Sequence, residues 1–193
     1  MFKQVIIKTT EVLSKLFFTF SKVSYQLIKI DGTTIDFTRE VYNTSNGVTL
    51  LLYNKSNKTV ILTKQFRLPT YLNDNTDGMM VEACAGIIDN FDDPEVTIIR
   101  EIEEETGYKI KEVKKLFELF PMPGTVTEKL HFFVAEYQSS QKIGLGGGLE
   151  HEKENIEVLE LTFEEAYKQI ETGEIQDAKT VILLQYAKIN IFN

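Results

Sequence analysis

The sequence of 193 residues predicts an α/β/α sandwich, with helices on both faces of a mixed sheet, preceded by a small antiparallel sheet. Two observations predict this class. Short runs rich in β-branched and aromatic residues recur along the chain, and three segments with helix-start signals are inserted among them. With 42% hydrophobic residues, a chain of this length can bury about 70% of its unfolded surface and needs no disulfide to fold.

The N-terminal segment is expected to form an antiparallel sheet over residues 1–45. Residues 17–30 are rich in aromatic and β-branched residues, and Asp31-Gly32 supplies a hairpin turn into a second strand over residues 34–42. The polar residues 43–47 then mark a boundary. We therefore expect a second domain over residues 46–193.

The second domain alternates strands and helices. Residues 162–172 begin with the capping box Thr162-Phe163-Glu164-Glu165, which predicts a helix, and a last helix is expected over residues 177–189. Loops are expected over residues 68–78, which contain Pro69 and four Asn or Asp residues, and over the glycine-containing and acidic residues 139–155. The expected strands cover residues 48–53, 59–66, 79–85, 109–120, 130–137 and 156–161.

One further helix is short and sharply bounded. Asp92-Asp93-Pro94 provides an acidic N-cap followed by proline in the first turn, and Gly107 fits the position just after the last turn. Apolar residues predict that one side of this helix faces the core. These residues are Val96, Ile98, Ile99 and Ile102.

The same helix carries three carboxylates on one face. Glu101, Glu104 and Glu105 are spaced i, i+3, i+4, which brings their Cβ atoms to about 5–6 Å from one another. Like charges so placed repel, unless a hard divalent cation such as Mg²⁺ lies between them and keeps positions for substrate phosphates. Arg100 can hold Glu104 by a charge-assisted bond. The alternative is a solvated acidic face, but the caps and the apolar side favour a half-buried helix.

Residues 86–108 resemble the Nudix box, which is a glycine, five residues, a glutamate, seven residues, and then Arg-Glu-apolar-x-Glu-Glu-x-Gly-apolar. Asp92 stands where the pattern has glutamate, so it keeps the charge but has a shorter reach. The other defining positions are in register, namely Gly86, Arg100, Glu101, Ile102, Glu104, Glu105, Gly107 and Tyr108. A match of this length is far more specific than a lone glycine motif.

The resemblance extends over essentially the whole chain to the bacterial GDP-mannose pyrophosphatases of the ADP-ribose pyrophosphatase-like branch. It implies the Nudix fold and a Mg²⁺-dependent hydrolysis, with Mn²⁺ as a substitute, of the diphosphate bond of a nucleoside diphosphate sugar. GDP-mannose, split into GMP and mannose 1-phosphate, is the first choice of substrate, and ADP-ribose or another ADP-sugar is the alternative. The supporting stretches are residues 39–42, 65–67, 82–86, 116–119, 146–148 and 173–180.

The resemblance also implies the metal ligands and the catalytic residues. Glu101 and Glu105 are the implied direct ligands together with the backbone carbonyl of Ala85, and Glu104 is a further ligand or a neighbour held through water. Arg100 and Glu104 count among the catalytic residues.

A later acidic loop follows Gly146–Gly148, glycines that are expected to let it close over bound substrate. The resemblance makes Glu154 an extra metal ligand and Glu152 the general base. His151 is an alternative base, since its unperturbed pKa suits proton transfer. Without the upstream box, these acids would read as a solvated loop tip.

Substrate contacts are implied for residues from several segments. Arg39, Arg67 and Lys179 could equally be ordinary surface residues, and Phe17 could equally belong to the core. Residues 38–40 would reach the site of a partner subunit, because in this branch the N-terminal sheet exchanges between subunits, which implies a homodimer. The implied residues are Phe17, Thr38, Arg39, Glu40, Arg67, Gly86, Glu128 and Lys179.

Composition excludes other classes of protein. A net charge of −8 and an isoelectric point near 4.9 oppose binding to nucleic acid. No apolar run reaches 18 residues, and residues 1–8 lack the features of a signal peptide, so we expect no membrane segment and a cytoplasmic protein. The single cysteine, Cys84, is expected to be a buried apolar residue. Two weaker alternatives are an inactive nucleotide-binding module and a Ca²⁺-binding protein, which would need an Asp-rich loop that this chain lacks.

Overall fold

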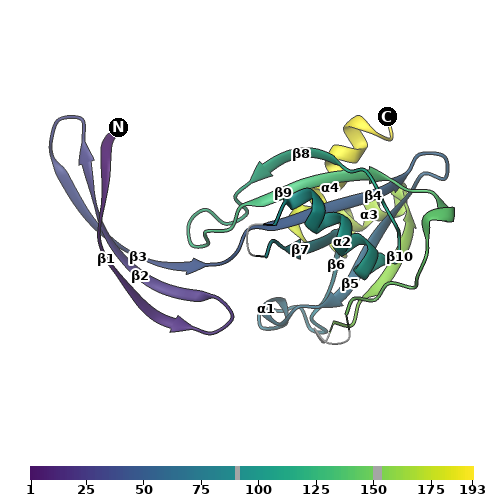
Figure 1. Cartoon of the computed structure of the whole chain (residues 1–193), viewed down its shortest axis with the longest axis horizontal. Coiled ribbons are helices and arrows are strands. Elements are labelled where there is room, and N and C mark those ends of the chain that lie inside the picture. Colours follow the sequence, from purple (N-terminus) through teal and green to yellow (C-terminus); the bar gives the residue numbers. More distant parts are fainter. Residues whose placement is uncertain (90–91, 150–153) are drawn as a thin grey trace. The chain divides into compact units, whose positions relative to one another are not determined.

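The protein is described by a computed structural model covering residues 1–89, 92–149 and 154–193 (Figure 1). The chain forms two compact units. The first consists of Met1–Asn46 and Phe120–Lys129, and the second of Gly47–Leu119 and Leu130–Asn193. None of the helices in the described ranges is both long enough and apolar enough to cross a bilayer.

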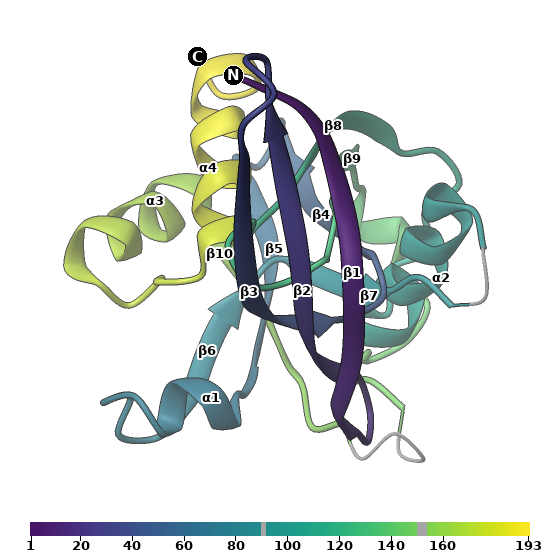
Figure 2. The same cartoon turned by 90° about the vertical axis from the view of Figure 1, so that its left-hand side faces the viewer.

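The first unit is built on a three-stranded antiparallel sheet in the order β1 (Phe2–Lys15), β2 (Thr19–Lys29), β3 (Thr34–Asn43), seen side by side in Figure 2. The predicted hairpin turn is confirmed. Asp31 Oδ1 accepts a hydrogen bond from the N–H of Thr33 at 3.0 Å, and Gly32 adopts a φ of +84°. Only the second and third of these strands were predicted individually from the sequence, because lysines interrupt the apolar pattern of β1.

This first unit has almost no interior. Ser21 is its only buried residue, and all of its residues are described. Several large apolar side chains of β1 are more than half exposed, among them Val5, Ile7 and Val12. A sheet of this kind buries too little apolar surface to offset the entropy of ordering its own strands.

The second unit contains a seven-stranded sheet. Its order is β10-β5-β4-β9-β8, with β6 beside β5 and β7 beside β4. The pairing of β4 with β9 is parallel and the others are antiparallel, so the sheet is mixed as predicted. The strands are β4 (Gly47–Asn54), β5 (Thr59–Phe66), β6 (Met79–Glu82), β7 (Cys84–Ile87), β8 (Lys114–Leu119), β9 (Leu130–Glu136) and β10 (Glu157–Thr162).

Helices cover both faces of this sheet, which confirms the predicted α/β/α sandwich (Figure 1). Successive residues of β4 point to opposite faces. Leu51 packs in one core cluster with residues of α3 (Phe163–Thr172) and α4 (Ala178–Asn190). Leu50 packs in the other cluster with residues of α2 (Pro94–Thr106).

Several predicted elements differ in extent from those observed. The predicted strand over residues 79–85 is divided at Ala83, where the chain leaves β5 and pairs with β4. The strand expected from residue 109 begins at Lys114, because the N–H of Lys109 instead donates to the carbonyl of Gln141. The loops predicted over residues 68–78 and 139–155 contain the short helices α1 (Leu68–Tyr71) and η1 (Ser139–Gln141).

Helix starts follow the predicted chemistry. Thr162 and Glu165 form the expected capping box at the start of α3. Asp177 caps α4 by accepting the N–H of Thr180 at 3.0 Å. Thr180 is fully buried, and its hydroxyl accepts the N–H of Ala83 at 2.7 Å while donating to Asp177 at 2.5 Å. Helix α4 is thereby attached to the backbone between β6 and β7.

We predict that Thr180→Val lowers the free energy of unfolding by about 1–3 kcal/mol, because a buried N–H and a carboxylate each lose a partner while the side-chain volume is kept. Urea unfolding followed by circular dichroism measures the change. Thr180→Ser retains the hydroxyl and should recover most of the loss. A valine variant as stable as the original protein would contradict this attachment.

Candidate metal and active site

Helix α2 is bounded as the sequence predicts. Asp93 is the N-cap and accepts the N–H of Glu95 at 2.8 Å, Pro94 occupies the first turn, and Gly107 ends the helix with a φ of +75°. Asp92, the position that departs from the Nudix pattern, is exposed, and its N–H donates to the carbonyl of Asp89. These caps fix where each turn of the helix begins.

The apolar side of α2 differs from the prediction at one residue. Ile98 and Ile102 are completely buried and Ile99 is half-buried, but Val96 is 65% exposed. Val96 lies two residues before Ile98 and so points to the opposite side of the helix. Thr97 is buried in its place.

The three carboxylates on the adjoining face lie at different depths. Glu105 is 2% exposed, whereas Glu101 and Glu104 are half-buried and Glu103, on the other side, is exposed. Burial of charged side chains to this depth without partners is costly. The groups that surround these acids therefore decide what the face can do.

Strand β7 lies against this acidic face. The N–H of Ala85 donates to Glu105 Oε2 at 3.4 Å. The Glu101 carboxyl lies so close to the Cα of Gly86 that a Cβ on residue 86 would overlap it. The glycine that begins the Nudix pattern is therefore required by the close approach of a side chain, and not by an unusual φ.

Arg100 supplies positive charge on the same face. Its guanidinium donates to Glu104 Oε2 at 2.6 Å, the contact that the spacing predicts, and also to Glu101 Oε1 at 2.7 Å. In residues 1–89, 92–149 and 154–193, no three acid, histidine or cysteine side chains are arranged to enclose a metal ion. Arg100 takes up one oxygen atom each of Glu101 and Glu104.

Arg100 does not offset the cost of burying these carboxyls. Burial raises the pKa of Glu101 to about 7, and the favourable effect of Arg100 is opposed by Glu104 and Glu154. Burial likewise raises the pKa of Glu105 to about 8, with Glu101 and Glu154 adding to the shift. Oxygen ligands that repel one another in a poorly solvated place suit a hard dication, so the residues present fit Mg²⁺.

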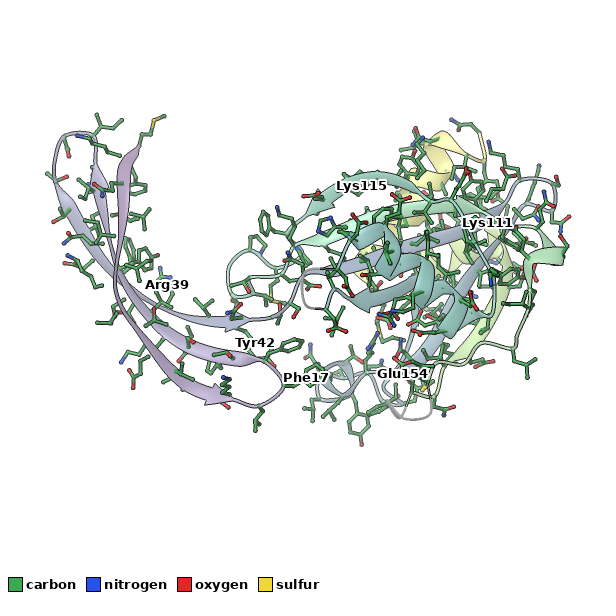
Figure 3. The ribbon with its side chains drawn as sticks, viewed as in Figure 1. Phe17, Arg39, Tyr42, Lys111, Lys115 and Glu154 are labelled. Atoms are coloured by element: carbon green, nitrogen blue, oxygen red, sulfur yellow. The ribbon has the colours of Figure 1, made fainter. Side chains whose placement is uncertain are left out.

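Glu154 belongs to this cluster through its charge, as the effect on Glu101 and Glu105 indicates, and Figure 3 labels it within the second unit. Its carboxylate accepts the N–H of Leu149 at 3.1 Å. Glu152 and His151, the two candidates for the general base, lie outside the described residues.

Arg67 and Lys179 meet at a buried carboxylate that the sequence analysis did not single out. Glu82 is 5% exposed and accepts Arg67 Nε at 2.8 Å and Lys179 Nζ at 2.9 Å, while Lys179 also pairs with Asp177 at 3.0 Å. Burial lowers the pKa of Lys179, but Glu82 and Asp177 outweigh this effect and the pKa is raised. The sequence feature that could have indicated this site is Glu82 itself, a single acid at the end of an apolar strand.

The remaining predicted substrate residues lie in the first unit (Figure 3). Phe17 is 82% exposed between β1 and β2. Thr38 shares a hydrogen bond with Ser24 at 3.1 Å, and the guanidinium of Arg39 lies 5.2 Å from the centre of the Phe37 ring. Glu40 is exposed and Glu128 is half-buried.

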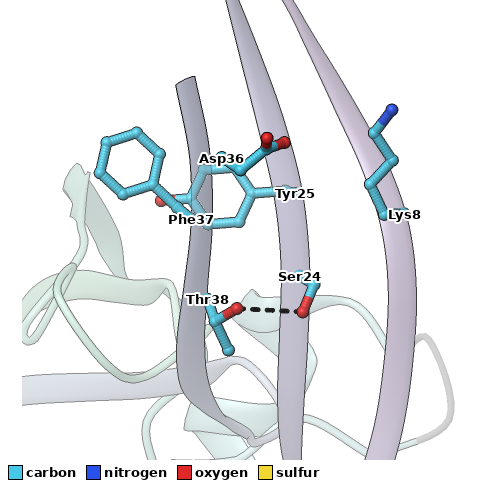
Figure 4. A pocket seen from close by; sticks show the side chains of 6 residues that line it. All are labelled: Lys8, Ser24, Tyr25, Asp36, Phe37 and Thr38. Atoms are coloured by element: carbon cyan, nitrogen blue, oxygen red, sulfur yellow. Dashed lines mark hydrogen bonds between the residues drawn. The ribbon is translucent and has the colours of Figure 1, made fainter. Parts of the chain in front are cut away.

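A hollow of about 340 Å³ opens on the sheet of this unit (Figure 4). It is lined by Lys8, Ser24, Tyr25, Asp36, Phe37 and Thr38. One lysine and one aspartate give it no net charge, so its lining does not favour a phosphate or a metal ion. The acidic cluster of the second unit remains the candidate site.

Comparison with known proteins agrees with the fold. The NUDIX domain model matches residues 44–184, so the chain belongs to the Nudix family. It is 50% identical over 190 residues to the GDP-mannose pyrophosphatases of Escherichia coli O157:H7 and Shigella dysenteriae serotype 1 (strain Sd197), covering 98% of this chain and of each relative. A crystal structure of an ADP compounds hydrolase superposes with a TM-score of 0.73 at 18% identity, covering 99% of this chain and 98% of that one, and shows the fold.

We predict that Gly86→Ala lowers the free energy of unfolding by about 1–3 kcal/mol, because the new methyl group must displace the Glu101 carboxyl. Gly124→Ala, where a Cβ would meet nothing within 4 Å, is the matched control. Urea unfolding of both variants measures the difference. In a Glu101→Ala background the cost of Gly86→Ala should disappear, and a cost that persists there would contradict the contact.

Proposed function

We propose that this protein hydrolyses the diphosphate bond of a nucleoside diphosphate sugar with Mg²⁺, and that its substrate is GDP-mannose, which yields GMP and mannose 1-phosphate. The observation that carries the proposal is the acid cluster formed by the buried Glu105 and the half-buried Glu101 and Glu154. The choice of sugar nucleotide rests on relatives that are 50% identical over 98% of both chains.

The reaction needs charge neutralisation, because the oxygens of a diphosphate repel an attacking water. Bound Mg²⁺ would neutralise that charge and lower the pKa of a water molecule. Glu101, Glu105 and Glu154 would hold it, with the carbonyl of Ala85. Glu104 contributes a further ligand or a contact through water.

Arg100 has a defined role within this proposal. It donates hydrogen bonds to Glu101 at 2.7 Å and to Glu104 at 2.6 Å, and these bonds hold the two carboxyls in place on the helix face. By family resemblance we propose Glu152 as the general base that accepts the proton of the attacking water, with His151 as the alternative.

For substrate binding we propose Arg67 and Lys179 as the cationic contacts of the second unit. The Arg67 side chain is 41% exposed although it pairs with Glu82, so part of its guanidinium can still bind phosphate. The Lys179 side chain is only 14% exposed, and it bonds two carboxylates. Lys179 therefore acts mainly by holding Glu82 and, through it, Arg67. Phe17, Arg39 and Glu128 stay proposals from the resemblance.

We predict that the purified protein releases GMP from GDP-mannose faster than it releases AMP from ADP-ribose, and only with Mg²⁺ or Mn²⁺. A panel of nucleoside diphosphate sugars with nucleotide products resolved by chromatography measures this. Turnover of ADP-ribose well above that of GDP-mannose would replace the proposed substrate. Absence of turnover on the whole panel would favour an inactive nucleotide-binding module.

The metal assignment is tested by a pair of isosteric changes on helix α2, one on the acidic face and one, as the control, on the exposed side. Glu105→Gln should lower Mg²⁺-dependent turnover by about 10³-fold, since several kcal/mol of charge stabilisation are lost. The fold should persist because an amide avoids the burial cost that raises the pKa of Glu105 to about 8. Glu103→Gln, on the exposed side, should leave turnover unchanged. Equal effects of the two changes would refute the metal assignment.

We further propose that the protein is a homodimer assembled through the first unit. The support is the exposure of Val5, Ile7 and Val12 on β1, together with the lack of a core in this unit. The single cysteine is buried and free, which suits a reducing compartment, so we propose a cytoplasmic location.

For the dimer we predict a mass of twice the 22.2 kDa of the chain by light scattering at micromolar concentration. Ile7→Lys should shift the equilibrium toward single chains, because a charge replaces an apolar contact in the interface. Ile189→Lys, at a 63% exposed position of α4, is the matched control. A single-chain mass for the unchanged protein would refute the dimer.

A further inference from the structure

The segment Gly144–Gly148, which we call the glycine strap, lies across the C-terminal end of α2. The last four carbonyls of an α-helix have no partner within the helix. In α2 the carbonyls of Glu104 and Glu105 accept the N–H groups of Gly148 at 3.1 Å and Gly147 at 2.9 Å. The strap therefore caps the helix that carries the acid cluster.

The approach of the strap to the helix is too close for side chains. A Cβ on Gly146 would overlap the carbonyl oxygen of Glu105, and one on Gly107 would overlap the carbonyl oxygen of Gly144. Gly146, Gly147 and Gly148 also adopt φ values of +71°, +110° and +81°. These glycines are thus engaged in a fixed backbone contact, in addition to any freedom they give the chain.

The strap also holds Glu154. The carboxylate of Glu154 accepts the N–H of Leu149 at 3.1 Å and lies against the Cα of Gly148, where a Cβ would overlap the carboxylate oxygen. The backbone of Glu154 donates to the carbonyl of Leu149 at 3.4 Å, and Ile156 donates to Gly147 at 3.2 Å. Glu154 therefore contacts Leu149 and Gly148, and Gly148 is itself hydrogen-bonded to the end of α2.

We propose that Gly148 is a positioning residue for the metal site, because its missing side chain lets the Glu154 carboxylate lie against a strap that is hydrogen-bonded to the helix of Glu101 and Glu105. This inference rests on the proposed function, in which Glu154 is a metal ligand. It adds that the loop acid and the helix acids are held in a fixed relation by backbone contacts. Outer contacts of this kind typically change metal affinity by about 10–100-fold.

The chain offers a matched control one residue away. Gly147 has a φ of +110°, which disfavours a side chain at least as strongly, but a Cβ there would lie 3.6 Å from its nearest neighbour, the carbonyl oxygen of Ile156. Gly147→Ala thus adds backbone strain without touching Glu154. Gly148→Ala adds comparable strain and displaces the carboxylate.

The experiment measures binding of Mg²⁺ and Mn²⁺ to the full chain by calorimetry without substrate, beside the melting temperature. We expect Gly148→Ala to weaken binding by about 10–100-fold and Gly147→Ala to leave it close to the original value. In a Glu154→Gln background, Gly148→Ala should have no additional effect. Should Gly148→Ala fail to fold, Gly148→Asn places a Cβ at the same position with a residue that tolerates positive φ.

Two results would overturn the inference while leaving the proposed function intact. One is an equal loss of Mg²⁺ affinity in the Gly147 and Gly148 variants. The other is an effect of Gly148→Ala that persists in the Glu154→Gln background. Failure of the proposed function would appear in the unchanged protein, which would then bind no Mg²⁺ or hydrolyse no nucleoside diphosphate sugar, and that result would overturn both.

Discussion

The chemistry that we propose for this protein depends on the burial of two like charges, Glu101 and Glu105, between helix α2 and strand β7. Neither carboxyl has enough positive charge around it, and burial raises the pKa values to about 7 and about 8. A fold that tolerates such a cost usually does so at a functional site. Both acids are held by a helix whose ends and whose apolar side leave them little freedom to turn toward water.

The second group of buried charges in the same unit behaves differently, and the contrast is informative. Arg67 and Lys179 are balanced by Glu82 and Asp177, so two cations face two acids, and the raised pKa of Lys179 indicates that its charged form is stabilised. Near α2, Arg100 pairs with Glu101 and Glu104, and the charges of Glu105 and the loop residue Glu154 add to the negative charge of the same cluster. The excess negative charge is therefore concentrated around α2. A dication bound there would lower the electrostatic free energy of the folded protein most.

Much of this arrangement could be predicted from the sequence because it is encoded locally. The caps of α2, the spacing of its acids and the contact of Arg100 with Glu104 all depend on residues within one helix. The contact of Glu82 with Lys179 and the attachment of Thr180 to Ala83 each join residues 97 positions apart, and no local pattern reveals them. The division of the predicted strand at Ala83 likewise depends on pairing first with β5 and then with β4. Val96 was misplaced because residues two apart on a helix face opposite sides, which a simple run of apolar residues hides.

The glycines show most clearly how far a motif can be understood physically. Gly86 and Gly148 are separated by 62 positions, yet each lacks a side chain where a carboxylate, Glu101 or Glu154, lies against the backbone. Two acids that repel each other are thus each in close contact with backbone, Glu101 with β7 and Glu154 with the strap. Because a backbone cannot rotate away as a side chain can, this arrangement keeps the repelling groups in place in the absence of a cation. The glycines of the site thus act as a rigid support for its charge, and flexibility is not what these two positions require.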